Sequence, residues 1–400
     1  MEYSLDFYGT LAALVAVLLI GRFFIAKITF LRDFNIPEPV VGGLIVAAIL
    51  ALTSHFAGID FKFDNSFKDP LLLAFYTSIG LSADFVAFKK GGKILFIFLA
   101  AVAALLVLQN AVGVGAALVM GVDPLVGLLG GSITMSGGHG TGAAWAEVFG
   151  AAPYNFGAAT EAAIAAATFG LVAGGIVGGP VASFLVRRRA LATPGEGGEA
   201  ESVFEKPDEE RKITAASFIE SLALIAISLL VGTWLSSVLK GGAFTLPTFV
   251  YCLLVGAILR NLIQTTHIHQ VFDREIYVIG NVSLSLFLAF VLMTIDLSKL
   301  VSLALPMSVI LVLQVTLMVF FAIFVTFNMC GRNYDAAVLA AGHCGFGLGA
   351  TPTAIANMQA VTNHYGMSHM AFLIVPLVGA FLIDLVNALV IAGFLKLPVF

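Results

Sequence analysis

Two glycine-rich segments carry the groups in this sequence that are best suited to binding a small molecule. Residues 136–142 read Ser-Gly-Gly-His-Gly-Thr-Gly, and residues 345–353 combine three glycines with a proline and two threonines. Clustered glycine and proline break a helix, so peptide N–H and C=O groups are left uncovered, while the hydroxyl groups add neutral donors and acceptors. A helix that restarts after such a break directs free N–H groups toward a carboxylate.

These two segments therefore predict a binding site for a carboxylate. The residues that we assign to it are Ser136, Gly137, Gly138, His139, Gly140, Thr141, Gly347, Gly349, Thr351 and Thr353. The alternative is that small residues only let neighbouring helices pack closely. That alternative is our interpretation of Gly113, Gly115, Gly174 and Gly175 elsewhere in the chain.

An aspartate stands in the middle of the last apolar run of the chain. Asp384 is followed three residues later by Asn387, so the two side chains share one face of a helix. A charged group within a membrane is costly and usually functional. Carboxylate and amide oxygens suit a small hard cation, which is the role we predict for this pair. The alternative is a hydrogen-bonded pair that only joins helices.

Four further polar side chains fall within apolar runs. We add Asn110 and Glu161 to the predicted cation site as oxygen donors. Glu161 opens its run, where a helix dipole or water explains it equally well. Gln109 and Gln314 are interpreted as hydrogen-bonding links between helices, and Asn110 has the same alternative role.

Several kinds of catalytic site are missing from the sequence. The seven histidines form no H-E-x-x-H motif and have no cysteine partner at zinc spacing, and G-x-S-x-G is absent. Residues 345–350 match G-x-G-x-x-A, but apolar segments flank them in place of a strand–helix unit. The three cysteines are too few and too widely spaced for a disulfide framework. We therefore expect no enzyme and no cofactor.

The composition indicates a membrane protein. Of the 400 residues, 60% are hydrophobic and 11% are charged, against roughly 45–50% and 25% in soluble domains. The mean hydropathy is +1.02. The net charge of −4 excludes a typical nucleic-acid binder. Because the first twenty residues hold two acidic residues and no Lys or Arg, no signal peptide is predicted. We expect an all-α polytopic membrane protein.

Apolar runs of about 20 residues mark the predicted membrane spans. There are ten of them: 8–29, 38–57, 70–88, 94–120, 158–186, 214–239, 247–265, 276–296, 300–328 and 369–396. Two further segments, 124–149 and 335–360, are apolar but broken by glycine, proline and threonine. Irregular backbone survives at membrane depth only where protein or a water-filled cavity surrounds it, so both are predicted to be re-entrant hairpins.

The basic residues predict the orientation. Clusters of Lys and Arg near residues 22–32, 89–93 and 187–189, with Arg260, Arg274 and Arg332, fall on one side if both termini lie outside. The charged segment 187–213 then lies in the cytoplasm, and its composition is that of a linker. It separates an N-terminal half, 1–186, from a C-terminal half, 214–400.

The two halves resemble each other. Residues 36–50 are similar to 246–260, LVLQ at 106–109 recurs at 311–314, and 136–144 align with 348–356. Asp123 and Asp335, which open the hairpins, match at the same offset as the last pair. Because each half has five spans, the repeats must be inverted, which is typical of secondary transporters.

The same motifs resemble one family. SGGHGTGAAW at 136–145, residues 333–360, FLIDLVNALVI at 381–391, IPEPVVGGL and TLPTFV closely resemble the bacterial glutamate:sodium symporters over nearly the whole chain. The resemblance implies two inverted five-span halves with re-entrant loops, and uptake of L-glutamate with Na⁺ across the inner membrane. The vertices would be residues 137–140 and 347–350. By analogy with related citrate carriers, it also implies a homodimeric elevator.

On this reading glutamate binds the hairpin tips and Na⁺ binds Asp384, Asn387, Asn110 and Glu161, with no other metal or cofactor. A negative interior opposes an anion by about 2.3 kcal/mol per charge per 100 mV, so we expect electrogenic uptake with two or more Na⁺.

Both termini would be periplasmic. The moving part would hold both hairpins with spans 158–186 and 369–396, and the dimer scaffold would hold spans 8–29, 38–57, 214–239 and 247–265. A carrier of another acid, such as citrate, is the alternative on the same fold, whereas a channel would need a continuous pore.

Overall fold

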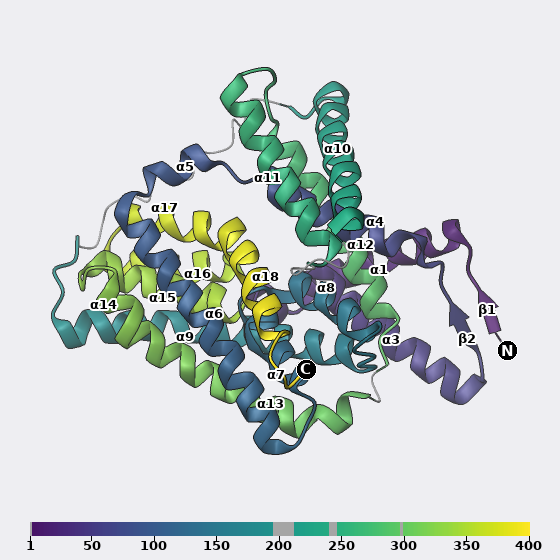
Figure 1. Ribbon diagram of the computed structural model, residues 1–400. Coiled ribbons are helices and arrows are strands. Elements are labelled where there is room, and N and C mark those ends of the chain that lie inside the picture. The colour runs from purple at the N-terminus through teal and green to yellow at the C-terminus, as the bar shows by residue number, and fades with distance from the viewer. Residues whose placement is uncertain (1, 195–211, 240–245, 297–298) are drawn as a thin grey trace. The chain divides into compact units, whose positions relative to one another are not determined.

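The computed structural model describes residues 2–194, 212–239, 246–296 and 299–400, and these are almost entirely helical (Figure 1). Most of the predicted charged linker, residues 195–211, lies outside the described residues. Within the described part, eight helices are long and apolar enough to cross a membrane. They are α1 (Phe7–Lys27), α3 (Glu38–Ala57), α6 (Gly92–Met120), α9 (Ala159–Arg189), α10 (Ala215–Leu239), α11 (Thr248–Thr266), α12 (Asp273–Met293) and the segment Leu303–Met329. The chain is a multi-pass helical membrane protein, as its composition predicts.

Two of the ten predicted spans are not among these eight helices. In place of a span over 70–88, α4 (Lys68–Leu81) ends after 14 residues, and a separate short helix, α5 (Phe85–Lys90), follows. In place of a span over 369–396, α17 (His369–Leu377) leads through a π-helical turn, η4 (Val378–Leu382), into α18 (Ile383–Phe394). Pro376, which lacks a backbone donor, lies two residues before this turn. The length of an apolar run in the sequence does not predict such departures from a single long helix.

The chain divides into two compact units. The first unit holds residues 1–84 and 213–301, and the second holds 85–212 and 302–400. The first unit contains α1, α3, α4, α10, α11 and α12, with the short elements α2 (Thr29–Asp33) and η1 (Asn65–Phe67). The second unit contains α5, α6, α7 (Pro124–Leu128), η2 (Leu129–Ile133), α8 (Gly138–Gly150), α9, most of α13 (Lys299–Phe321), η3 (Ala322–Thr326), α14 (Phe327–Met329), α15 (Tyr334–Leu348), α16 (Thr351–Tyr365) and α17 to α18.

Each predicted half contributes to both units in the same order. The half 1–186 supplies three helices to the first unit, and then a long helix, a helical hairpin and a final helix to the second. The half 214–400 supplies the same sequence of elements, from α10 to α18. All four spans predicted for the scaffold lie in the first unit, and both hairpins lie in the second. The division into two repeats stays a prediction.

Close approach of helix backbones holds the first unit together. A Cβ atom at Gly21 on α1 would lie 2.0 Å from the backbone oxygen of Glu38, and one at Gly42 on α3 would lie 1.9 Å from that of Val17. Only glycine fits at this crossing. Leu81 of α4 belongs to an apolar cluster that also contains side chains of α10, α11 and α12.

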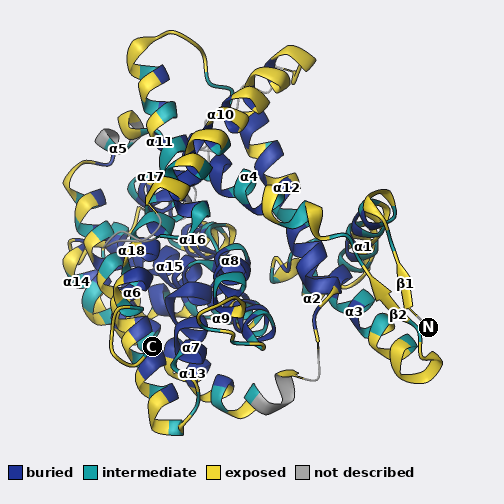
Figure 2. Cartoon of the chain, turned by 45° about the vertical axis from the view of Figure 1, so that its right-hand side comes forward, coloured by how far each residue is buried: buried dark blue, intermediate teal, exposed yellow. Residues whose placement is uncertain are grey.

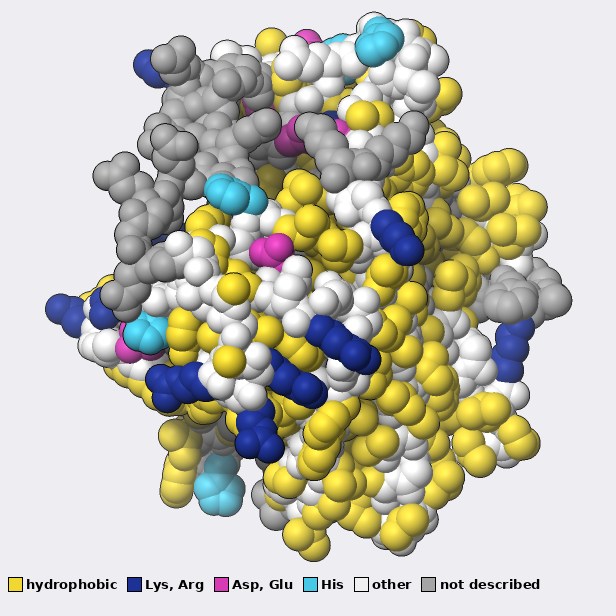
Figure 3. Space-filling view, turned by 90° about the vertical axis from the view of Figure 1, so that its left-hand side faces the viewer, with side chains coloured by type: hydrophobic (Ala, Val, Ile, Leu, Met, Phe, Trp, Pro, Cys, Tyr) yellow, Lys and Arg dark blue, Asp and Glu magenta, His cyan; other side chains and the backbone are white. Residues whose placement is uncertain are grey.

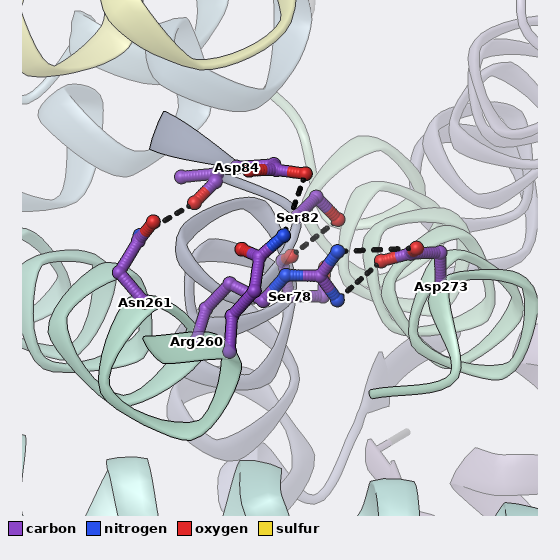
Figure 4. A network of polar contacts seen from close by, with 8 residues as sticks. Ser78, Ser82, Asp84, Arg260, Asn261 and Asp273 are labelled. Carbon is purple, nitrogen blue, oxygen red and sulfur yellow. Dashed lines mark hydrogen bonds and ion pairs between the residues drawn. The ribbon is translucent and has the colours of Figure 1, made fainter. Parts of the chain in front are cut away.

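A polar network fixes one end of the first unit (Figure 4). The buried guanidinium of Arg260 forms two contacts with the carboxylate of Asp273, at 2.7 and 3.2 Å. One turn further along α11, the amide of Gln264 donates to Asp84 at 3.1 Å. The bidentate pairing compensates for the burial of the Arg260 charge. The network thus joins α11 to α12 and to the residues that follow α4.

A two-stranded parallel sheet, β1 (Glu2–Ser4) with β2 (Asp60–Lys62), lies at the N-terminal end of the first unit. Lys62 forms an ion pair with Glu2 across it. In the following turn, hydrogen bonds from the hydroxyl and then the backbone N–H of Ser66 hold the pKa of Asp64 below its usual range. These polar contacts suit a segment outside the membrane.

The distribution of buried and exposed side chains fits a lipid environment. Helices α8 and α15 are buried along most of their length (Figure 2). In contrast, α10 exposes large apolar side chains such as Leu230 and Trp234. Hydrophobic side chains also cover much of the face in Figure 3, where Lys and Arg gather mainly across the lower middle. An apolar surface of this kind faces lipid more favourably than water.

Candidate functional site

The first predicted hairpin, 124–149, is a helix interrupted at glycine. The side chain of Asp123 caps α7 by accepting a hydrogen bond from the backbone N–H of Leu125 at 2.9 Å. Helical geometry is lost at Gly131, within η2, and the chain turns at residues 136–137. Helix α8 restarts at Gly138, whose φ of +66° lies in the left-handed region that favours glycine. The break therefore coincides with the Gly-Gly pair that the sequence points to.

The second predicted hairpin, 335–360, is a helix–turn–helix. The side chain of Asn333 caps α15 by accepting a hydrogen bond from the N–H of Ala336 at 2.9 Å. Helix α15 ends at Leu348, the turn lies at residues 349–350, and α16 restarts at Thr351 with Pro352 in its first turn. Both tips are formed largely by buried residues of the second unit.

The two tips meet each other. A Cβ atom at Gly138 would lie 3.1 Å from the backbone oxygen of Gly349, so the backbones approach closely. The hydroxyl of Ser136 lies 3.4 Å from the backbone oxygen of Gly347. Residues more than 200 positions apart in the sequence therefore form one junction.

Helix α6 holds this junction through Gln109, a fully buried residue. Its amide nitrogen donates to the backbone oxygen of Gly347 at 2.7 Å, and its amide oxygen accepts from the hydroxyl of Ser136 at 2.7 Å. The sequence indicated only a general link between helices for this residue. The repeated LVLQ motif at 106–109 gave no reason to expect that Gln109 bonds to the tips of both hairpins.

Oxygen atoms gather beside the tips. The hydroxyl of Ser132 donates to the amide oxygen of Asn387 at 2.6 Å, and the amide nitrogen of Asn387 donates to the backbone oxygen of Ser132 at 2.9 Å. The N–H of Ser132 donates to the side-chain oxygen of Asn110 at 2.9 Å. One turn from Asn387, the carboxylate of Asp384 accepts a hydrogen bond from the hydroxyl of Thr141 at 3.2 Å. Three of the four residues predicted for the cation site thus share one neighbourhood, and Ser132, which the sequence analysis missed, joins two of them.

The remaining predicted residues are positioned differently. His139 is buried and lies 3.0 Å from the hydroxyl of Thr168 on α9. Thr351 donates to the backbone oxygen of Gly379 in η4 at 2.9 Å, so its hydroxyl hydrogen is already used. The hydroxyl of Thr353 is buried and has no hydrogen-bond partner within the described residues. Glu161 is buried in the first turn of α9.

Helix α9 supports the second hairpin through small residues. A Cβ atom at Gly170 would lie 2.1 Å from the backbone oxygen of Leu348. Asn357 on α16 donates to the backbone oxygen of Gly174 at 2.8 Å. A Cβ atom at Gly174 would lie 3.1 Å from the backbone oxygen of Gly345, which matches the packing role expected for this glycine.

Comparison with known proteins identifies the family. The family model "Sodium/glutamate symporter" matches residues 3–367. A sodium/glutamate symporter of Escherichia coli (strain K12) is 55% identical, and the alignment covers 100% of this chain and 99% of the relative. The chain belongs to the sodium/glutamate symporter family. The resemblance of its motifs to this family is therefore confirmed.

A second relative supports the same family, whereas a solved structure is similar only at a low level. The sodium/glutamate symporter of Haemophilus influenzae is 52% identical, with 97% of this chain and 96% of the relative covered. The solved structure of the sodium proton antiporter MjNhaP1 from Methanocaldococcus jannaschii at pH 8 covers 96% of both chains. It is 14% identical with a TM-score of 0.39, which is too low to establish a shared fold. Membership in the symporter family indicates a transporter and not an enzyme.

Proposed function

We propose that this protein takes up L-glutamate together with Na⁺ across the inner membrane. The proposal is supported by its membership in a family whose E. coli and H. influenzae members are sodium/glutamate symporters. The observation that carries it for this chain is the junction of the two hairpin tips beside Asp384. Backbone N–H groups at the starts of α8 and α16 would bind an anion there, and the oxygen atoms of Asp384, Asn387 and Asn110 would bind a cation.

Glutamate would bind at the tips through neutral donors. Among the described residues of the second unit, Lys and Arg lie at or beyond the ends of its helices, and none is buried in its interior. The free N–H groups at the starts of α8 and α16 would face the substrate carboxylates. The hydroxyl of Thr353, which is buried without a partner in the described part of the chain, is the side-chain donor we assign to this role.

Sodium would bind between the first hairpin and α18. Asp384 supplies a carboxylate, while Asn387, Asn110 and the backbone of Ser132 supply neutral oxygen atoms. A cation offsets the cost of a carboxylate within the membrane. Oxygen ligands of this kind match the preference of a hard cation. Because Na⁺ would neutralise Asp384, it would also favour the nearby binding of an anionic substrate.

The second unit would be the part that moves. All the residues proposed to bind glutamate or Na⁺ lie within it, so it could carry them as one body. The first unit would be the scaffold of a homodimer, and the two inverted repeats would open the site alternately to each side. Both termini would be periplasmic and residues 187–213 cytoplasmic. With two or more Na⁺ per glutamate, each cycle would carry net positive charge inward.

Competition for uptake tests the substrate. Purified protein in liposomes should take up labelled glutamate, and excess unlabelled glutamate should suppress this uptake more strongly than equal concentrations of aspartate or citrate. If glutamate is not transported and labelled citrate or another dicarboxylate is, the protein is a carrier of a different acid on the same fold.

A further inference from the structure

Gln109 is the one α6 side chain that bonds to the tips of both hairpins in the described part of the chain. It is fully buried, and both ends of its amide are used. The nitrogen donates to the backbone oxygen of Gly347 in the second tip, and the oxygen accepts from the hydroxyl of Ser136 in the first. Because Ser136 is also near Gly347, the three groups form a closed triangle.

The amide is well suited to this position because it carries a donor and an acceptor on one planar group. A carboxylate would keep the acceptor for Ser136 but lose the donor to Gly347. A leucine of similar size would lose both and leave Ser136 and Gly347 only their 3.4 Å contact with each other. Each change therefore has a distinct consequence for the two tips.

The neighbouring residue contacts the proposed sodium site. Asn110 accepts a hydrogen bond from the N–H of Ser132, which in turn bonds twice to Asn387. Consecutive residues of α6 thus hold the first hairpin at two points, Ser132 and Ser136, which lie four positions apart. A shift of the first hairpin at Ser132 is therefore transmitted through α6 to Ser136, and the reverse also holds.

We propose that Gln109 is a positioning residue that couples the binding of Na⁺ to the binding of glutamate. It holds the two tips in the arrangement that both ligands need, without contacting either ligand itself. The inference rests on the proposed function and adds the physical connection between its two sites. If α6 and the hairpins form one framework, occupation of the Na⁺ site stabilises the tip arrangement that glutamate recognises.

Gln314 offers a matched control on the neighbouring helix. It occupies the corresponding position of the repeated LVLQ motif, and it is fully buried like Gln109. Its amide nitrogen donates to the backbone oxygen of Gln109 at 2.7 Å, and its amide oxygen has no hydrogen-bond partner among the described residues. Replacing Gln314 therefore disturbs the contact between α13 and α6 but removes no side-chain bond to a tip.

The test measures how strongly Na⁺ changes the affinity for glutamate. Equilibrium binding of labelled glutamate to purified protein is measured at low and at saturating Na⁺ for the parent, Gln109→Leu, Gln109→Glu and Gln314→Leu. The ratio of the two dissociation constants is the coupling between the ligands, typically about 5- to 150-fold in coupled systems. We expect this ratio to fall to within about threefold of unity in Gln109→Leu, to fall partly in Gln109→Glu, and to stay close to the parent value in Gln314→Leu.

A purely structural role would lower the yield of folded protein without changing the ratio. The proposal is overturned if Gln109→Leu keeps the parent ratio, or if Gln314→Leu reduces it equally. Should Gln109→Leu fail to fold, Ser136→Ala removes the two contacts that its hydroxyl makes in the triangle without altering α6, and an unchanged ratio there also overturns the proposal. A parent protein whose glutamate binding ignores Na⁺ would instead refute the proposed function.

Discussion

The hydroxyl of Thr141 donates a hydrogen bond to the carboxylate of Asp384 at 3.2 Å, joining the first hairpin to α18. Sequence analysis assigned these two residues to different ligands, Thr141 to the substrate and Asp384 to the cation. Their contact means that the two proposed sites would share a boundary. A change in the charge state or occupancy of Asp384 therefore acts directly on the start of α8.

Replacing Thr141 by Val should weaken the site that Asp384 forms. Val keeps the shape but cannot donate, and a hydrogen bond to a charged group contributes about 1.5–3 kcal/mol, or roughly ten- to a hundredfold in affinity. We expect the half-saturating Na⁺ concentration for glutamate uptake to rise by about tenfold or more. Thr141→Ser, which retains the hydroxyl, should stay near the parent. Equal behaviour of the Val and Ser variants would remove this hydrogen bond from the mechanism.

Replacing Asp384 by Asn should raise the Na⁺ concentration needed for uptake. The amide keeps the shape and one oxygen atom but removes the charge that would hold the cation. Insertion and folding should be unaffected, because the neutral side chain is less costly within the membrane. The comparison is uptake of glutamate against Na⁺ concentration for the two proteins. An unchanged half-saturating concentration would show that Asp384 only links helices.

Replacing Gly170 by Ala should destabilise the packing of α9 behind the second tip. The added Cβ atom would lie 2.1 Å from the backbone oxygen of Leu348, so a backbone must shift. Overpacking of this kind costs about 1–3 kcal/mol. We expect a lower melting temperature for the purified protein and weaker binding of glutamate. Gly179→Ala, on the same helix with nothing within 4 Å of the new atom, is the matched control and should melt no lower than the parent.

Two exposed loops test the orientation. In a variant without the three native cysteines, all of which are buried, Cys replaces either Ala151 after α8 or Ile268 after α11. The predicted topology places position 151 outside and position 268 inside. An impermeant thiol reagent should therefore label position 151 in intact cells and position 268 only after permeabilisation. Labelling of both from the same side would contradict the inverted arrangement.

Much of this fold could be predicted from local sequence. Apolar length located eight continuous helices within a few residues, because a span of about 20 apolar residues is a strong signal. Clustered glycine and proline located both helix breaks. The end of α4 at Leu81 and the π-helical turn before Ile383 could not be predicted in the same way. Both depend on how neighbouring helices satisfy backbone groups, which apolar length does not encode.

The site was predictable in its parts but not in its connections. Residue chemistry singled out Asp384, Asn387 and the tips. It gave no indication that Ser132 bonds to Asn387 or that Gln109 reaches Gly347, because these partners lie 255 and 238 residues apart. Nor did it show that Thr351 donates to Gly379 and so differs from Thr353. Such distinctions arise only when the second unit is assembled.

The most direct test of the account is glutamate uptake driven by a Na⁺ gradient alone. Purified protein is reconstituted into liposomes with the membrane potential clamped at zero, and labelled glutamate is supplied outside with either Na⁺ or K⁺. The account predicts that inward Na⁺ drives glutamate to an internal concentration above the external one, and that equal Na⁺ on both sides allows only equilibration. Uptake that is the same in Na⁺ and in K⁺, or that never exceeds equilibration, would contradict coupled symport.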